Sequence, residues 1–388
     1  MRPEDKVHAG VAGVFFAFGV GLGLWSGASG AILARAGVDA GALGIILTAF
    51  TGVYLAAMTA GGALGRRFGL RSTLTVGCVL VGAALLALLN ARSEGAVAGL
   101  LLLFAGLAGV VDVAMNAEGA RIERQRGKPI LARLHGAASA GIAVGAVLGS
   151  LIAATPAPGV AGLLGAAGMG AAALAFARVS RGEAPAARPV RRVGLGLSFA
   201  PALIVLGLVI GASIAAETAA LLWSSLLLRA EAPGLAAISG LGAAFFALCQ
   251  ATLRFNADGI RLRFGDRRVV VASFAVAAAG FAATALDAGF AASVAGFALI
   301  GLGTGAIVPC GFALAARQTP GEPAVGLSSA SLFSAMTRLP APLAIGAIAG
   351  AFSLPAAFGA LAGAAALAGA GMATFGPDEG VASEISND

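Results

Sequence analysis

Apolar runs of about 20 residues recur along the whole of this chain, and they limit its fold more than any other feature. A helix of about 20 residues spans the roughly 30 Å hydrocarbon core of a bilayer. Because lipid offers the backbone no hydrogen bonds, a spanning segment must be a helix or a strand of a closed barrel. These runs lack the two-residue alternation of barrel strands. We therefore predict an all-α membrane protein.

The amino-acid composition leads to the same class. Of the 388 residues, 59% are hydrophobic and 11% are charged, whereas a soluble domain has about 25% charged residues. The chain therefore has too few polar residues to cover a surface that faces water. We predict twelve transmembrane helices, at residues 9–34, 42–64, 73–91, 96–118, 132–154, 159–179, 198–228, 235–257, 269–286, 289–316, 324–350 and 354–375.

The basic residues predict the orientation of these helices. Of the 25 Lys and Arg, 21 fall in the N-terminus and the even-numbered connections, among them Arg66, Arg121, Arg261 and Arg317. Because short loops rich in Lys and Arg stay on the cytoplasmic side, we expect both termini in the cytoplasm. The isoelectric point near 10.5 follows from this topology, so it does not indicate a nucleic-acid partner.

An internal repeat divides the chain into two halves. Residues 64–71 read LGRRFGLR and residues 260–267 read IRLRFGDR. Both fit Leu/Ile-x-x-Arg-Phe-Gly-x-Arg, and they lie 196 positions apart, close to half of the 388 residues. Between them, 180–197 is the longest polar segment and contains Pro185 and Pro189. We expect an N-terminal six-helix bundle (1–179), a cytoplasmic linker (180–197) and a C-terminal bundle with a short cytoplasmic tail (198–388).

Twelve spans in two halves, with a basic loop after spans 2 and 8, resemble the major facilitator superfamily. Within it, DVAMN (112–116) and LHGAASAG (134–141) resemble the branch of fucose-permease-like inner-membrane carriers. The resemblance implies two pseudo-symmetric six-helix bundles, transport of a small molecule by alternating access, and a functional monomer. It also implies a place in the inner (plasma) membrane of a bacterium.

The resemblance further implies that the two repeated loops grip helix ends in one conformational state. The family pattern has an Asp where this chain has Arg66, and Leu262 occupies that place in the second half. Asp258, four residues before Leu262, is the better acidic candidate. The alternative is that charge alone holds these basic residues in the cytoplasm. The candidate gating residues are Arg67, Gly69 and Arg71 in the first half and Asp258, Arg263, Gly265 and Arg267 in the second.

Ionisable side chains inside the predicted spans are candidates for function, because an unpaired charge in lipid costs several kcal/mol. Asp112 and Asn116 share one face of span 4, and His135 lies at a similar depth on span 5. An Asp that faces a His could carry a proton; the alternative is a structural hydrogen-bond cluster between the two spans. Glu118, at the end of span 4, is expected to pair with Arg121 or Arg124.

The second half contains Glu217 in span 7 and Arg338 near the middle of span 11. Glu217 is expected to carry a proton or bind the cargo. Arg338 stays charged and needs a partner, which could be Asp112, Glu217 or an anionic group of the cargo. Gln250 and Arg254 share a face of span 8 and would extend the polar lining.

Three further features concern the span ends and breaks. Trp25 and Trp223 lie near the outer ends of spans 1 and 7, where they would either anchor the helices at the interface or contact the substrate. Pro309 is expected to kink span 10.

The function that we predict is secondary transport, with a proton as coupling ion and a small polar or anionic metabolite as cargo. One alternative is a proton-driven exporter of hydrophobic compounds, which the scarcity of membrane amides and aromatic residues favours. A membrane-embedded enzyme built on Asp112 and His135, and a sensor without transport, are the remaining alternatives. The three cysteines and two histidines have no ligand spacing, so we expect no metal, no cofactor and no enzymatic activity.

Overall fold

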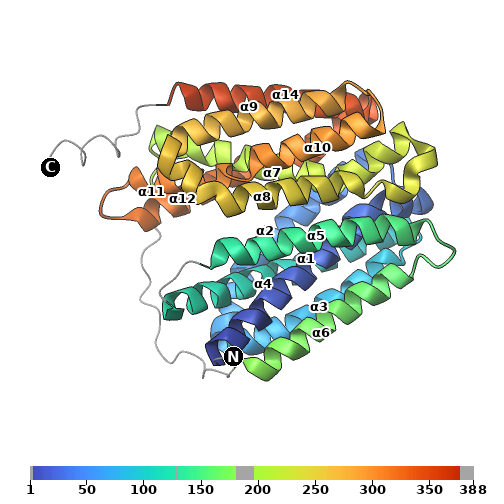
Figure 1. Cartoon of the computed structure of the whole chain (residues 1–388), viewed down its shortest axis with the longest axis horizontal. Helices are drawn as coiled ribbons and strands as arrows, with labels where there is room; N and C mark the ends of the chain where they lie inside the picture. The colour runs from blue at the N-terminus through green and yellow to red at the C-terminus, as the bar shows by residue number, and fades with distance from the viewer. Residues whose placement is uncertain (1–2, 127–129, 181–195, 376–388) are drawn as a thin grey trace.

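The computed structural model describes residues 3–126, 130–180 and 196–375, and these are almost entirely helical (Figure 1). The expected linker therefore lies largely, and the tail after residue 375 wholly, outside the described residues. The helices are α1 (Pro3–Ala36), α2 (Ala40–Phe68), α3 (Leu70–Leu89), α4 (Glu94–Arg126), α5 (Leu131–Ala153), α6 (Val160–Val179), α7 (Pro201–Glu231), the short 3-10 helix η1 (Pro233–Ile238), α8 (Leu241–Phe264), α9 (Asp266–Ala285), α10 (Phe290–Thr304), α11 (Ile307–Arg317), α12 (Pro323–Arg338), α13 (Ala341–Ala351) and α14 (Leu354–Ala373).

The predicted all-α membrane fold is confirmed. In the described part of the chain, eleven helical segments are long and apolar enough to cross a membrane. The twelfth is α8, which has 24 residues but carries Arg254, Asn256 and Asp258 in its length. It begins at Leu241, later than predicted, because η1 and a turn precede it.

Two of the spans are each formed by two shorter helices, and proline explains both breaks. Pro309 has no N–H for the carbonyl of Gly305, and α10 ends one residue before that carbonyl, at Thr304. The predicted kink in span 10 is thus confirmed, as a full interruption. In span 11, Pro342 has no N–H for the carbonyl of Arg338, and α12 ends at Arg338.

The helices form two bundles, α1–α6 and α7–α14, and the loops of the repeat have the same geometry in both. Gly69 ends α2 with φ 81° and ψ 148°, and Gly265 ends α8 with φ 79° and ψ 150°. A residue with a side chain rarely adopts such a positive φ, so glycine is required at both. The guanidinium of Arg71 donates to the carbonyl of Ala177, and that of Arg267 donates to the carbonyl of Ala373. The two arginines are again 196 positions apart, and so are the two alanines.

Glycines allow the closest helix packing in the first bundle, between α1 and α5. A Cβ added at Gly141 would overlap the carbonyl oxygen of Phe16, and one at Gly145 would overlap that of Val20. From the other side, Gly23 is equally tight against the backbone of α5. Small residues at four-residue spacing let two backbones approach in this way inside lipid, where dispersion rather than hydrophobicity drives association.

The two bundles meet most closely at the end of the molecule that contains the turns 37–39, 154–159 and 232–240, which we call the far end. Gly44 of α2 abuts Gly346 of α13, and a Cβ at Gly240 would collide with the backbone of α5. At the opposite end, the basic end, α5 and α8 still touch, but the bundles diverge overall (Figure 1).

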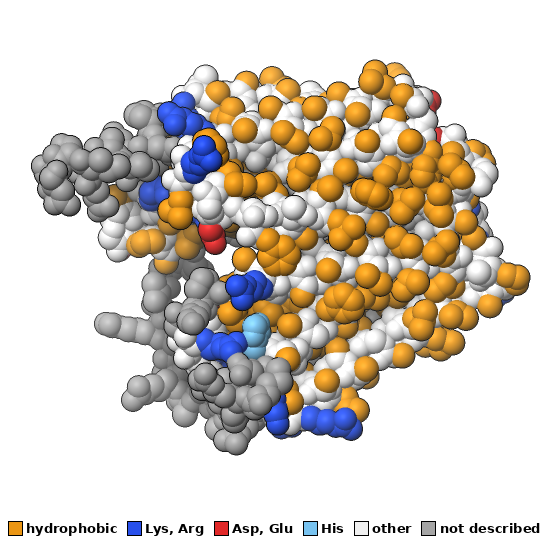
Figure 2. All heavy atoms as spheres, in the orientation of Figure 1, with side chains coloured by type: hydrophobic (Ala, Val, Ile, Leu, Met, Phe, Trp, Pro, Cys, Tyr) orange, Lys and Arg blue, Asp and Glu red, His pale blue; other side chains and the backbone are white. Residues whose placement is uncertain are grey.

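The surface agrees with an orientation across a membrane. Figure 2 shows apolar side chains over the visible flank and a group of Lys and Arg at the basic end. Many large apolar side chains face outward; Ile45, Leu163 and Leu367, for example, are 62%, 59% and 76% exposed. In water such a flank would be an aggregation site, whereas in a bilayer it is the surface that contacts lipid.

Replacing Gly141 by Ala is expected to destabilise the first bundle, because the new methyl would overlap the backbone of α1. We expect a loss of about 1–3 kcal/mol in the free energy of unfolding, measured by denaturation of the purified protein in detergent. The matched control is Gly168→Ala on α6, where a Cβ would meet nothing within 4 Å and should stabilise the helix by about 0.5–1 kcal/mol. Equal effects at both sites would contradict this account of the packing.

Candidate functional site

Polar side chains from both bundles form one cluster between them. Asn116 donates from its Nδ2 to Asp112 Oδ1 at 2.9 Å, and this pair lies on α4. The Tyr54 side chain from α2 interacts with the same carboxylate. The Arg338 guanidinium from α12 interacts electrostatically with both Asp112 and Tyr54. We call Tyr54, Asp112, Asn116 and Arg338 the cross-bundle cluster. It combines an acid, an amide, a phenol and a permanent cation inside the membrane-spanning region.

Arg338 has its position because α12 ends there. The proline-induced turn at 339–340 separates α12 from α13 in the middle of the span. No ion pair within 4.0 Å joins Arg338 to a carboxylate of the described residues, and its buried Nε has no hydrogen-bond partner among them. The Arg338 guanidinium thus interacts electrostatically with Asp112 without forming an ion pair with it. Its N–H groups remain available to donate hydrogen bonds to another acceptor.

A second group of charges joins α7 to α8. Arg254 of α8 forms an ion pair with Glu217 of α7, with 3.1 Å between Nη2 and Oε2. The other carboxylate oxygen of Glu217 is buried and has no partner within the described chain. Arg254 also interacts electrostatically with His135 of α5, which belongs to the other bundle. A cavity of about 310 Å³ separates α5, α8 and α11 here, and His135, Arg254, Asp258 and Pro309 are among its lining residues.

His135 does not belong to the cross-bundle cluster. Its ring packs edge-on against Phe15 of α1, with 5.4 Å between the ring centroids. The cation that acts on it is Arg254, and the described partners of Asp112 are Tyr54, Asn116 and Arg338. The two residues of the expected Asp–His pair therefore lie in separate groups, because the glycine packing of α5 against α1 turns His135 toward Phe15.

Three other predicted site residues are enclosed in the protein. Gln250 is 3% exposed and donates to Thr304 Oγ1 at 3.2 Å, which joins α8 to α10. Trp25 and Trp223 are 3% and 0% exposed. Burial of both indole rings excludes a role as anchors at the membrane surface, and they fill the core near the contact between α1 and α7.

The predicted gating residues of the repeat have structural contacts that match between the bundles. The guanidinium of Arg67 lies 5.3 Å from the ring centroid of Phe68, and that of Arg263 lies 5.2 Å from the ring of Phe264. Together with the two glycines and the carbonyl contacts of Arg71 and Arg267, these loops join α3 to α6 and α9 to α14.

The acidic residue at the centre of the second loop is Asp266 rather than Asp258. Asp258 is 81% exposed on its side chain and lies 3.6 Å from Arg261. Asp266, 7% exposed, accepts from Arg261 Nε at 2.6 Å and from Arg317 Nη2 at 2.5 Å, and so connects α8, α9 and α11. In the first bundle Glu118 binds Arg121 within α4, which confirms one of the two expected pairs.

Sequence reasoning missed Tyr54 and Asp266. Tyr54 is the single tyrosine of the chain and lies in the interior of span 2, far from the interfaces where tyrosine is enriched; this position was the available signal. Asp266 directly follows Gly265 in the repeat, where the first half has Leu70, so an asymmetry between the repeats marked it.

The chain is similar to transport proteins over most of its length. It is 29% identical to an uncharacterized MFS-type transporter of Yersinia pestis over 365 residues, with 88% of each chain covered. It is 26% identical to the uncharacterized transporter y4wD of Sinorhizobium fredii over 346 residues, covering 89% of this chain and 92% of the relative. No protein-family model matches the chain.

Solved structures establish the fold. A point mutant of the nucleoside transporter NupG superposes with a TM-score of 0.76 at 10% identity, covering 95% of this chain and 99% of the other. The human organic anion transporter MFSD10 superposes with a TM-score of 0.65 at 16% identity, covering 96% and 100%. The chain therefore has the major facilitator fold, with the all-helical architecture of these solved transporters. The relatives are named as transporters, which agrees with the expectation of a non-enzymatic membrane protein.

Replacing Asp266 by Asn should release Arg261 and Arg317 and loosen α8, α9 and α11. Removing one partner of a buried pair costs about 3–5 kcal/mol; because the Arg317 side chain is 48% exposed, we expect about 1–3 kcal/mol in the free energy of unfolding. Asp258→Asn, at an exposed pair, should cost less than about 0.5 kcal/mol. Denaturation of both variants in detergent measures the difference, and a larger loss for Asp258→Asn would contradict the assignment of Asp266 as the central acid.

Proposed function

We propose that this protein is a transporter of the major facilitator type, which moves a small anionic metabolite across the bacterial inner membrane by alternating access, coupled to protons. The observation that carries the proposal is Arg338, a cation in mid-span with free donors that faces Asp112 and Tyr54 of the other bundle. Arginine binds carboxylate and phosphate groups through two parallel hydrogen bonds. A solute with such a group would complete the cross-bundle cluster.

The cross-bundle location links binding to conformational change. Tyr54 and Asp112 lie on α2 and α4, whereas Arg338 lies on α12. A solute bound between them has contacts with both bundles, so its binding energy depends on their separation. A ligand shifts an equilibrium only through such differential contacts. We propose that residues 1–179 and 198–388 are the two bundles that rock, within a single functional chain.

The close contact at the far end supports an inward-facing state. The Ser26 hydroxyl of α1 donates to the carbonyl of Leu221 on α7, and the Ser225 hydroxyl of α7 donates to the carbonyl of Gly27 at 3.0 Å. The basic residues gather at the other end, where the cavity beside Arg254 lies. By the positive-inside rule, that end and both termini face the cytoplasm.

Glu217 and Asp112 are the groups that we propose for proton coupling. Glu217 shares a face of α7 with Ser213 and Ser224, and the described residues leave Glu217 Oε1 and both serine hydroxyls without hydrogen-bond partners. Buried polar atoms without partners are uncommon in folded proteins, and they occur where a site binds water, an ion or a reacting group. Protonation of Glu217 would release Arg254, and protonation of Asp112 would leave Arg338 dependent on the anionic solute.

Replacing Arg338 by Ala is expected to weaken solute binding about ten- to hundredfold, because a hydrogen bond to a charged group contributes about 1.5–3 kcal/mol. Arg338→Lys keeps the charge without the planar fork and should lose less. The measurement is thermal stabilisation of the purified protein by a panel of organic acids, phosphorylated metabolites and neutral analogues. Arg124→Ala, at an exposed residue of the basic end, is the control. A metabolite that stabilises wild type and Arg338→Ala equally would remove Arg338 from the site.

Replacing Asp112 by Asn or Glu217 by Gln should abolish uptake driven by a proton gradient while exchange of the solute across the membrane persists. A neutral amide of similar shape keeps the local packing but cannot release a proton. Proteoliposomes with and without an imposed pH gradient separate the two activities. Glu94→Gln, at an exposed position in the first turn of α4, should keep both. Gradient-driven uptake at the wild-type rate in both variants would refute proton coupling through these carboxylates.

A further inference from the structure

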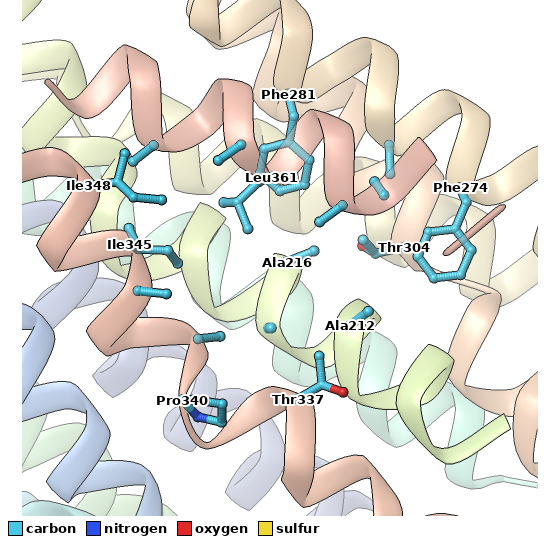
Figure 3. A pocket seen from close by; sticks show the side chains of 18 of the residues that line it. Ala212, Ala216, Phe274, Phe281, Thr304, Thr337, Pro340, Ile345, Ile348 and Leu361 are labelled. Carbon is cyan, nitrogen blue, oxygen red and sulfur yellow. The ribbon is translucent and has the colours of Figure 1, made fainter. Parts of the chain in front are cut away.

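The C-terminal bundle contains an apolar cavity of about 360 Å³ between α7, α9, α12–α13 and α14 (Figure 3). Its floor is formed by buried side chains, among them Phe274, Phe281 and Ile345. Its rim includes Met336, which is 63% exposed, and exposed alanines of α13 and α14. These are middle portions of membrane-spanning helices, so the mouth opens at the depth of the hydrocarbon.

The repeat explains why the cavity exists in this bundle. On α5, Gly141, Gly145 and Gly149 all abut the backbone of α1. The positions 196 residues later are Thr337, Ala341 and Ile345. Thr337 and Ile345 are larger than glycine, and the turn at 339–340 redirects the chain. As a result α12 packs against α7 through Gly207 and Gly211, whereas α13 leaves α7 and the space remains unfilled.

Smaller side chains enlarge the opening further. Ala212 of the second half corresponds, at the same spacing of 196, to Phe16, and Ala344 corresponds to Leu148. Phe16 and Leu148 are 41% and 38% exposed on the flank of the first bundle. Large side chains thus cover this position in one bundle, and alanines leave it open in the other. The pair Leu164 and Ala360 repeats the pattern.

The polar groups that line the cavity already have hydrogen-bond partners in the protein. Its lining includes no charged side chain, and its two threonine hydroxyls are already engaged. Thr304 accepts from Gln250, and Thr337 donates to the carbonyl of Leu208 at 3.3 Å. Apolar cavities without unpaired polar groups stay dry and accept apolar ligands. An empty cavity of this size would forfeit the dispersion energy of its walls.

We propose that this cavity is a binding site for the acyl chain of a membrane lipid. Hydrocarbon is the chemistry that fits an uncharged wall with satisfied hydroxyls. The surrounding bilayer supplies it through the mouth between α13 and α14. The chain would fill the space beside the α12–α13 break and so support the segment that ends in Arg338.

The test uses the full-length protein in liposomes that contain a phospholipid with a photoreactive diazirine in one acyl chain. After illumination, peptide mapping should show the strongest labelling at cavity residues such as Met336, Ile348 and Leu361. The double variant Ala212→Phe, Ala344→Leu copies the first bundle and fills the space; it should lower this labelling at least about fivefold. Ala347→Leu makes the same change as the second of these substitutions, at an exposed site of α13 outside the cavity lining, and should alter the labelling less than twofold.

Folding of each variant is checked by gel filtration and by thermal denaturation, where the filled variant should be at least as stable as wild type. Labelling of wild type that is no stronger in the cavity than on the outer face of α13 would overturn the proposal. The same holds if the filled variant keeps its labelling. Loss of the label on addition of an apolar compound that the protein also transports would make the cavity a cargo site instead of a lipid site.

Discussion

The cost of a charge inside lipid is the constraint on which the rest of this structure depends. An ionic group inside a span is stable only near an opposite charge, a hydrogen-bond partner or water. Asp112 and Arg338 meet this condition from different bundles, and Glu217 and Arg254 meet it within one. Because Asp112 and Arg338 belong to different bundles, each charge is stabilised by the other only while the bundles hold the two side chains close together. The electrostatic energy of this pair therefore depends on the relative position of the bundles.

The duplicated halves keep their loop geometry and differ in their packing. Gly69 and Gly265 have the same dihedral angles to within a few degrees, because the turn between two helices admits few solutions. In the core, Gly145 corresponds to Ala341, and prolines 340 and 342 have no counterpart in the first half. One bundle is therefore a tightly packed body, whereas the other has two broken helices and a cavity. The breaks lie where the candidate site lies.

Sequence reasoning predicted the features that follow from composition and repetition. Span number, the basic end, the repeat loops and the break near Pro309 depend on local chemistry that single residues reveal. It failed where rotation of a helix about its axis decides the outcome. Asp112 and His135 have similar depths, yet the glycines of α5 turn His135 onto Phe15. Tyr54 reaches Asp112 only because α2 packs beside α4, and no pattern within either segment specifies that contact.

The balance of energies indicates how such a molecule can change state. Reversing a two-state equilibrium from 1:99 to 99:1 requires about 5.5 kcal/mol of differential binding. Among the described residues, the side-chain hydrogen bonds that join α1 to α7 at the far end run from Ser26 and Ser225 to backbone carbonyls; neutral bonds of this kind contribute about 0.5–1.5 kcal/mol each. An ion pair across the far end would have been harder to break in a medium of low dielectric constant. Neutral groups and glycine contacts close the far end, so opening it does not require an ion pair to be broken there. The proposed anionic solute at Arg338 would therefore have to supply less differential binding energy than in a molecule whose far end is closed by charges.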